Sequence, residues 1–167
     1  TLTSNPFDWM EASFFYTSIQ NKPYCRVAYD PISKEDYKDK GFNLKLRLKE
    51  EGILPAIAIG FNDMAGTGYY SSEYIVGSYG INNLDIHFGL GWGTLNSSKH
   101  GIKNPLGYVN DSFLYRPKGY ADKGGQLQSS RYFSGRHAIN VLQGRAGLPV
   151  TRAVLIKILM NDSMLCY

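Results

Sequence analysis

The sequence predicts an all-β protein built as an antiparallel up-and-down meander, and three observations lead to this fold class. The 167 residues include 13 Tyr, 8 Phe and 18 Gly, a composition that favours strands over helices. Several segments alternate apolar and polar residues with a period of two, as strands with two different faces do. Short links between these segments alternate with longer ones, which predicts short turns on one rim and long loops on the other.

Six segments carry the strand pattern. The first is aromatic and extended. The second, GFNLKLRLK, sets its Phe and Leu side chains on one parity and Asn43, Lys45, Arg47 and Lys49 on the other, and the third, AIAIGFN, sets bulky side chains against small or polar ones. The expected strands are residues 7–20, 41–49, 56–62, 71–80, 84–92 and 131–143, with a seventh at 151–160.

The stretch NLDIHFGLGWGTL, residues 83–95, bears on what each face contacts. Its Leu, Ile, Phe and Trp side chains share one parity, while Asp85, His87 and the glycines share the other. A soluble sheet would bury the bulky parity, whereas a membrane barrel would turn it toward lipid. The cations Lys45 and Arg47 favour the barrel, because charge on a spanning strand is tolerated on the aqueous side. We therefore predict a segment of an outer-membrane-type β-barrel, too short to close alone.

A long loop at residues 96–130 interleaves cations with rings. Such loops are usually functional or disordered. Cations with flat rings suit a polymer of acidic sugars, and they also suit single-stranded nucleic acid. The plainer interpretation is a solvated loop anchored by its aromatic side chains. The cations are Lys99, Lys103, Arg116, Lys118 and Lys123, and the rings are Tyr108, Phe113, Tyr115 and Tyr120.

The net charge, the cysteines and the short motifs identify no single function. A net charge of +4 is compatible with nucleic acid, anionic lipid or acidic polysaccharide. Cys25 and Cys166 have no metal or redox spacing, and we expect two free thiols. His87 beside Asp85 is weak support for acid/base chemistry, and GLGWG does not match the dinucleotide fingerprint. We expect no enzyme, no cofactor and no metal.

Several pieces in order resemble the YjbH-like family of bacterial exopolysaccharide biosynthesis proteins. The pieces are LKLRLKEEG, PAIAIGFNDMAGTG with SSEY after it, FGLGWG, KNPLGY, the Arg116–Pro117 pair, GGQ at 124–126 and YFSG at 132–135. The resemblance covers about residues 7–137. Residues 138–167 depart from it as an atypical tail, which we interpret as a truncated fragment or a shifted reading frame near Gly135.

The resemblance implies a noncatalytic, lipoprotein-associated β-barrel component of exopolysaccharide or capsule biosynthesis and export in the bacterial outer membrane. It implies outer-membrane lipid, exopolysaccharide and other export proteins as partners, and we expect no nucleic acid. It supplies no residue roles. From the parity of the strands and the composition of the loop we expect lumen-facing Lys45, Arg47, Glu73, Asp85 and His87, and polymer-contacting Tyr108, Tyr115, Arg116, Lys118 and Tyr120.

Two other functions stay open from the sequence. One is a soluble β-barrel or sandwich that binds an acidic polysaccharide or a small ligand, with Leu84 to Trp92 lining its interior. The other is a carbohydrate-active enzyme that uses Glu73 and Asp85 as a carboxylate pair, which requires the two groups to lie roughly 5 to 9.5 Å apart across a cleft.

Overall fold

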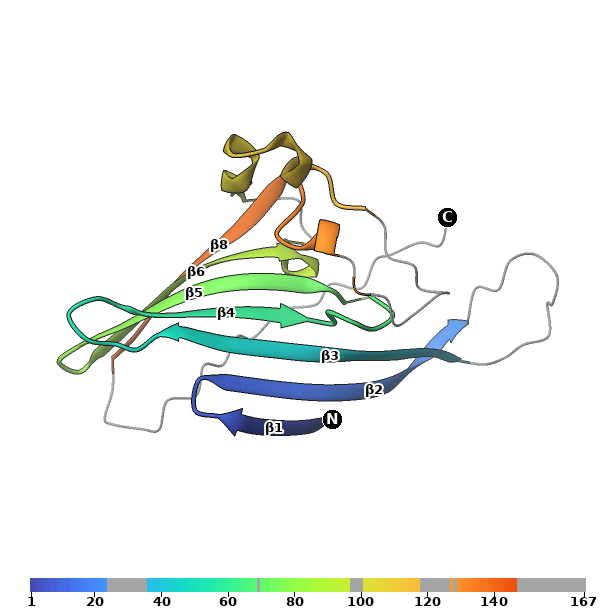
Figure 1. Cartoon of the computed structure of the whole chain (residues 1–167), viewed down its shortest axis with the longest axis horizontal. Coiled ribbons are helices and arrows are strands. Elements are labelled where there is room, and N and C mark those ends of the chain that lie inside the picture. Colours follow the sequence, from blue (N-terminus) through green and yellow to red (C-terminus); the bar gives the residue numbers. More distant parts are fainter. Residues whose placement is uncertain (24–35, 69, 97–100, 118–126, 128, 147–167) are drawn as a thin grey trace.

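The computed structural model describes residues 1–23, 36–68, 70–96, 101–117, 127 and 129–146. These residues form an antiparallel sheet of eight strands in the spatial order β1-β2-β3-β4-β5-β6-β8-β7 (Figure 1). Within the described part of the chain the sheet is open, with β1 and β7 at its edges. The predicted all-β antiparallel meander is confirmed, whereas these strands by themselves do not close into a barrel.

The strands match the sequence pattern closely. They are β1 (Leu2–Phe7), β2 (Met10–Pro23), β3 (Asp36–Lys49), β4 (Ala56–Asn62), β5 (Ser72–Ile81), β6 (Leu84–Gly93), β7 (Ile102–Lys103) and β8 (His137–Ala146). In the described ranges four short 3-10 helices accompany them: η1 (Thr94–Asn96), η2 (Pro105–Tyr108), η3 (Asp111–Leu114) and η4 (Ser129–Arg131). None of the helices in the described ranges has the length and hydropathy needed to span a membrane.

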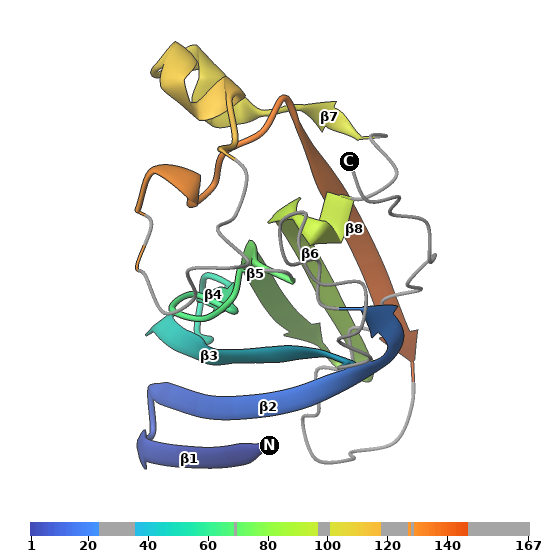
Figure 2. The same ribbon diagram turned by 90° about the vertical axis from the view of Figure 1, so that its right-hand side faces the viewer.

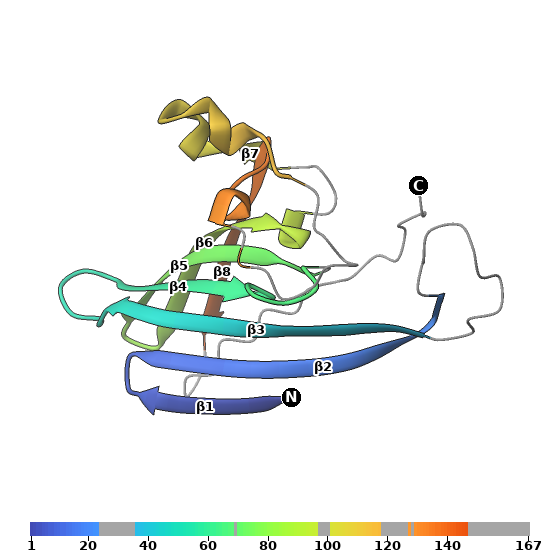
Figure 3. The same cartoon turned by 45° about the vertical axis from the view of Figure 1, so that its right-hand side comes forward.

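Turns and loops separate to the two rims of the sheet, as the link lengths predict. Residues 8–9, 50–55 and 82–83 connect strands on one rim, and the longer segments 63–71 and 94–136 leave from the opposite rim (Figure 3). Asn82 has a φ of 53°, a left-handed conformation that Asn adopts more readily than most residues, and this allows the tight link between β5 and β6.

The strand register gives the sheet two chemically different faces. Ile59 pairs with Leu46 and Ile75, and Ile75 pairs with Leu90, so bulky apolar side chains share one face across four strands. We call this the apolar face; its members include Phe14, Phe42, Ile57, Ile75, Leu84, Phe88 and Leu142. The polar face carries Ser13, Asn43, Lys45, Arg47, Asn62, Ser78, Asp85 and His87.

Hydrogen bonds between neighbouring strands stabilise the polar face. Asn43 Nδ2 donates to Ser13 Oγ at 3.1 Å, and Asn62 Nδ2 donates to Ser72 Oγ at 3.0 Å. His87 Nδ1 lies 2.9 Å from Ser78 Oγ. These contacts join β2 to β3, β4 to β5 and β5 to β6, so polar side chains hold adjacent strands in register over much of the sheet.

The centre of the apolar face is exposed instead of packed. Phe42 and Phe88 keep 49% and 46% of their surface exposed, and Ile57 and Ile75 each keep 38%. Among the described residues, the hydrophobic side chains that are fully buried are Trp92 and Ala138. The described loop segments lie at one end of the curved sheet (Figure 2), where they contact Glu73 at the start of β5 and Trp92 at the end of β6. The described part of the chain therefore has no dry apolar core of its own.

Residues 138–146 of the tail lie in β8 and pair with β6 from Ile139 to Ala146. Three expectations about elements need correction. The loop at 96–130 contains β7, η2 and η3, and Asn104 and Asn110 cap these two helical turns. The strand expected from residue 131 starts at His137, because Phe133 and Gly135 have positive φ. The first expected strand is preceded by β1, which makes a hairpin with β2. The proposed strand at 151–160 and both cysteines lie outside the described residues.

Candidate functional site

A buried cluster fixes the long loop on the loop-rim end of the apolar face. We call it the loop clamp. Two of its members, Glu73 of β5 and Trp92 of β6, are directly opposite each other in the sheet. The loop supplies the other three, Asn104, Arg116 and Phe133. Glu73 and Trp92 are each 1% exposed and Asn104 is 0% exposed, so these three side chains are sealed from solvent.

An ion pair between Glu73 and Arg116 is the centre of the loop clamp. Arg116 Nη1 lies 2.7 Å from Glu73 Oε2, and Nη2 lies 2.9 Å from Oε1, so the guanidinium grips the carboxylate with two parallel bonds. The Phe133 N–H also donates to Oε2 at 3.0 Å. The Glu73 and Arg116 side chains are 1% and 15% exposed, so both charges are largely desolvated.

The remaining donors of Arg116 bind the ends of β5 and η4. Nη2 donates to Ser71 O and Ser71 Oγ, and Nη1 donates to the Arg131 carbonyl at 2.8 Å. Gly93 makes room for this approach: it has a φ of 72°, and a Cβ there would lie 2.4 Å from Ser71 O and 2.7 Å from Arg116 Nη2. This explains one glycine of the GLGWG segment, because no other residue fits both the conformation and the space.

Asn104 joins three separate loop segments to the sheet. Its Oδ1 accepts from the indole N–H of Trp92 at 3.0 Å and from the Leu106 N–H at 3.1 Å. Its Nδ2 lies 2.9 to 3.0 Å from the carbonyl oxygens of Phe113, Phe133 and Gly135. The Asn-Pro sequence places Asn104 as the N-cap of η2, with Pro105 at its first position.

Aromatic rings complete the loop clamp. The Phe133 ring meets Trp92 edge-on at 5.2 Å and meets Phe61 edge-on at 5.5 Å. Tyr132 contacts Phe61 at 5.2 Å and donates its hydroxyl to the Met64 carbonyl. Phe133 has a φ of 56°, an unfavourable conformation that turns its N–H to Glu73 and its carbonyl to Asn104.

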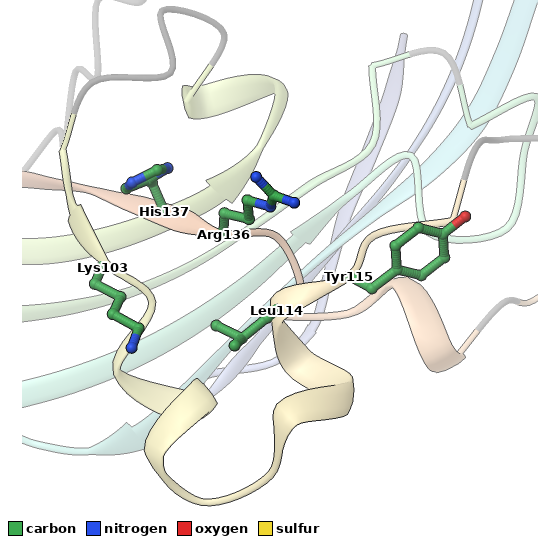
Figure 4. A pocket seen from close by; sticks show the side chains of 5 residues that line it. All are labelled: Lys103, Leu114, Tyr115, Arg136 and His137. Carbon is green, nitrogen blue, oxygen red and sulfur yellow. The ribbon is translucent and has the colours of Figure 1, made fainter.

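A pocket lies beside the loop clamp, where the loop meets the start of β8. Its volume is about 430 Å³, and the residues that line it are Lys103, Leu114, Tyr115, Arg136 and His137. Figure 4 shows Lys103 coming from β7, Leu114 and Tyr115 from the end of η3, and Arg136 and His137 from the start of β8. We call this the basic pocket, because its lining combines two cations and a histidine with no acidic side chain.

Buried acids at the loop rim form a second polar cluster. The Thr67 hydroxyl donates to Asp39, and Asp63 Oδ2 accepts from the Tyr70 N–H at 3.2 Å. Burial, followed by the charge of Asp39, raises the pKa of Asp63 to about 6. Asp39 Oδ2 and Asp63 Oδ1 are buried with no hydrogen-bond partner among the described residues.

Four of the residues expected to face a lumen share the polar face. Lys45 lies 4.0 Å from Glu11, and Arg47 lies 3.0 Å from Glu50, in pairs that remain open to solvent. Asp85 is exposed and His87 contacts Ser78. Glu73 is a correction, because the register sets it on the apolar face and Arg116 occupies its carboxylate. Glu73 and Asp85 lie on opposite faces, so they do not form a pair across one cleft.

The residues expected to contact polymer divide into three groups. Tyr108 and Tyr115 are 77% and 72% exposed on the loop, as such a role requires. Arg116 is a correction, since the buried ion pair uses its guanidinium. Lys118 and Tyr120 lie outside the described residues. Sequence reasoning missed Asn104, although the Asn-Pro turn signal could have identified it as a cap, and it missed the basic pocket, which no local motif encodes.

The described residues thus define an open antiparallel sheet protein with one apolar and one polar face and an anchored basic loop. No three His, Cys, Asp or Glu side chains in the described ranges gather into a possible metal site. A family model described as "Exopolysaccharide biosynthesis protein YbjH" matches residues 1–140. The chain belongs to this YjbH family, as the resemblance in its sequence indicated.

One relative extends this finding. Over 131 residues the chain is 40% identical to the "Uncharacterized lipoprotein YjbH" of Escherichia coli (strain K12). The alignment covers 77% of this chain and 18% of the relative, so the chain spans less than a fifth of that protein's length. No solved structure matches the chain.

Proposed function

We propose that the chain forms part of a noncatalytic β-barrel wall in the bacterial outer membrane and serves the export of exopolysaccharide or capsule polymer. Membership of an exopolysaccharide biosynthesis family supports the polymer, and the lipoprotein name of the relative supports a membrane location. The observation that carries the proposal is the apolar face, whose central Phe and Ile side chains are exposed in a sheet that has no dry core.

Lipid is the occupant that fits this face. A contiguous apolar surface across several strands marks an interaction site, because water makes such exposure costly. Charge on a lipid-facing strand costs about 2–4 kcal/mol at the bilayer centre. Lys45, Arg47, Asp85 and His87 all lie on the opposite, polar face, which faces the aqueous lumen in the proposed barrel. The open edges at β1 and β7 would pair with further strands of a longer protein.

Adjacent phenylalanines on β2 give a matched test. Phe14 lies on the apolar face and is 39% exposed, whereas Phe15 follows it on the polar face. Each would be replaced by Trp in a Trp9→Phe background, and the full chain would be reconstituted in vesicles whose acyl chains carry bromine, a short-range quencher. We expect strong quenching of Phe14→Trp beyond the Trp92 background and weak quenching of Phe15→Trp.

Two results would overturn this proposal. Equal quenching at both positions would mean that the two faces do not differ in lipid contact. A Phe14→Trp variant with blue-shifted emission and no quenching would mean that a second protein layer, and not lipid, covers the apolar face.

A further inference from the structure

We propose that the basic pocket binds an acidic sugar unit, of the uronic acid class, in the polymer that the protein helps to export. This inference rests on the proposed export function and adds the chemical class of the polymer and the place where it is held. Its volume of about 430 Å³ lies within the range of about 300 to 1,000 Å³ that small-ligand sites have.

The charges of the basic pocket are available to a ligand. Among the ion pairs found in the described residues, none involves Lys103, Arg136 or His137. All three side chains are exposed, in contrast to Arg116, whose guanidinium is satisfied by Glu73 and backbone carbonyls. Arginine binds a carboxylate with two parallel bonds and lysine attracts one as a point charge, so either cation at the edge of the pocket can hold a sugar carboxylate.

Apolar and aromatic side chains give the basic pocket a preference for sugars. Leu114 contributes an aliphatic surface, and Tyr115, whose ring is 72% exposed, also lines the pocket. The Lys103 ammonium lies 5.1 Å from the centre of the Tyr108 ring, a cation–π contact that positions this cation next to a second exposed ring. Flat rings pack on the C–H faces of sugars, whereas a simple inorganic anion would gain nothing from them.

The loop clamp holds the basic pocket in place. Lys103 precedes Asn104 and Tyr115 precedes Arg116. Arg136 follows Gly135, whose carbonyl accepts from Asn104 and whose N–H donates to the Phe113 carbonyl at 2.8 Å. Three lining residues are therefore direct neighbours of residues anchored to the sheet. A site held this way loses little conformational entropy when a ligand binds.

The test titrates the full chain, in detergent micelles, with a galacturonic acid tetramer. The methyl ester of the tetramer serves as the uncharged control ligand. Loss of one charge-assisted contact should weaken binding at least about tenfold, since such a contact is worth roughly 1.5–3 kcal/mol. The test variant is Lys103→Gln/Arg136→Gln. The control, Lys38→Gln/Lys49→Gln, removes the same charge from exposed positions of β3. Trp92 emission in a Trp9→Phe background reports whether each variant keeps the loop clamp closed.

We expect the acid tetramer to bind, the ester to bind at least about tenfold more weakly, and the test variant alone to lose the preference for the acid. Tyr115→Ala should weaken acid and ester alike, because it removes ring contact and not charge. Equal weakening by the control variant would overturn the proposal in favour of general charge attraction. Tighter binding of an oligothymidylate would overturn it in favour of nucleic acid.

The two proposals fail separately. If Phe14→Trp is quenched by brominated lipid while the tetramer does not bind, the uronic acid site is refuted and the membrane role stands. If the tetramer binds at the basic pocket but neither face contacts lipid, the membrane role is refuted and the chain is a polysaccharide-binding sheet.

Discussion

Replacing Arg116 by Met should destabilise the protein far more than the loss of an ordinary surface ion pair. The methionine keeps an apolar stem but leaves the Glu73 carboxylate, which is 1% exposed, with the single N–H of Phe133 as a charge-stabilising donor among the contacts above. Removing one partner from a buried pair costs about 3–5 kcal/mol, because the remaining charge stays desolvated. We expect a loss in this range.

The matched control is Arg47→Met. Arg47 lies 3.0 Å from Glu50, but the two side chains are 40% and 78% exposed, and exposed pairs contribute about 0–1 kcal/mol. Urea titration would give the free energy of unfolding, with Trp92 as the single tryptophan in a Trp9→Phe background. Hydrogen exchange at the Phe133 amide would report opening of the loop clamp, because this amide donates to Glu73.

A third variant separates charge from packing. Changing Glu73 and Arg116 together to Met removes both charges, so it should recover more than half of the stability lost in Arg116→Met. The reasoning would be refuted if Arg116→Met and Arg47→Met lost the same stability within about 0.5 kcal/mol, the scatter of independent surface substitutions.

Three further predictions concern the same rim. The pKa of Asp63 is raised from 3.8 to about 6 in the folded protein, so its contribution to stability is present below pH 3.8 and is lost as the pH rises through about 6. Asp63→Asn should flatten this decline by roughly 3 kcal/mol in denaturation measured from pH 4 to 7. Asn104→Ala should cost at least about 3 kcal/mol, because it strands the buried Trp92 N–H and several carbonyls; a red shift of Trp92 emission checks this, and unchanged emission would contradict it. Gly93→Ala should cost about 2 kcal/mol or more from its φ of 72° and the contact with Arg116; a loss below about 0.5 kcal/mol in urea titration would show that the loop clamp tolerates the methyl group.

The sheet could be predicted from the sequence because its signal is local. Alternation in GFNLKLRLK and in residues 84–92 fixes which side chains share a face, and the register confirms that Lys45 and Arg47 share one with Asp85 and His87. The alternation of residues 71–80 is irregular, and there the expected lumen-facing position of Glu73 differs from the register, which sets Glu73 on the apolar face.

The loop clamp could not be predicted in the same way. Glu73 and Arg116 are 43 positions apart, and Trp92 and Asn104 belong to different elements. The polar composition of the loop predicts that its cations are exposed to solvent. Arg116 is nevertheless largely buried, because a carboxylate on the sheet compensates its charge. Period-two alternation predicts a strand at Phe133, because alternation carries no information about a positive φ.

The loop leaves the sheet after β6 and returns at β8, and these strands are neighbours. Asn104, Arg116 and Phe133 anchor this loop at three separate positions along its length, and each has its own contacts. A single substitution at one anchor should therefore loosen one part of the loop first, while strand pairing between β6 and β8 persists.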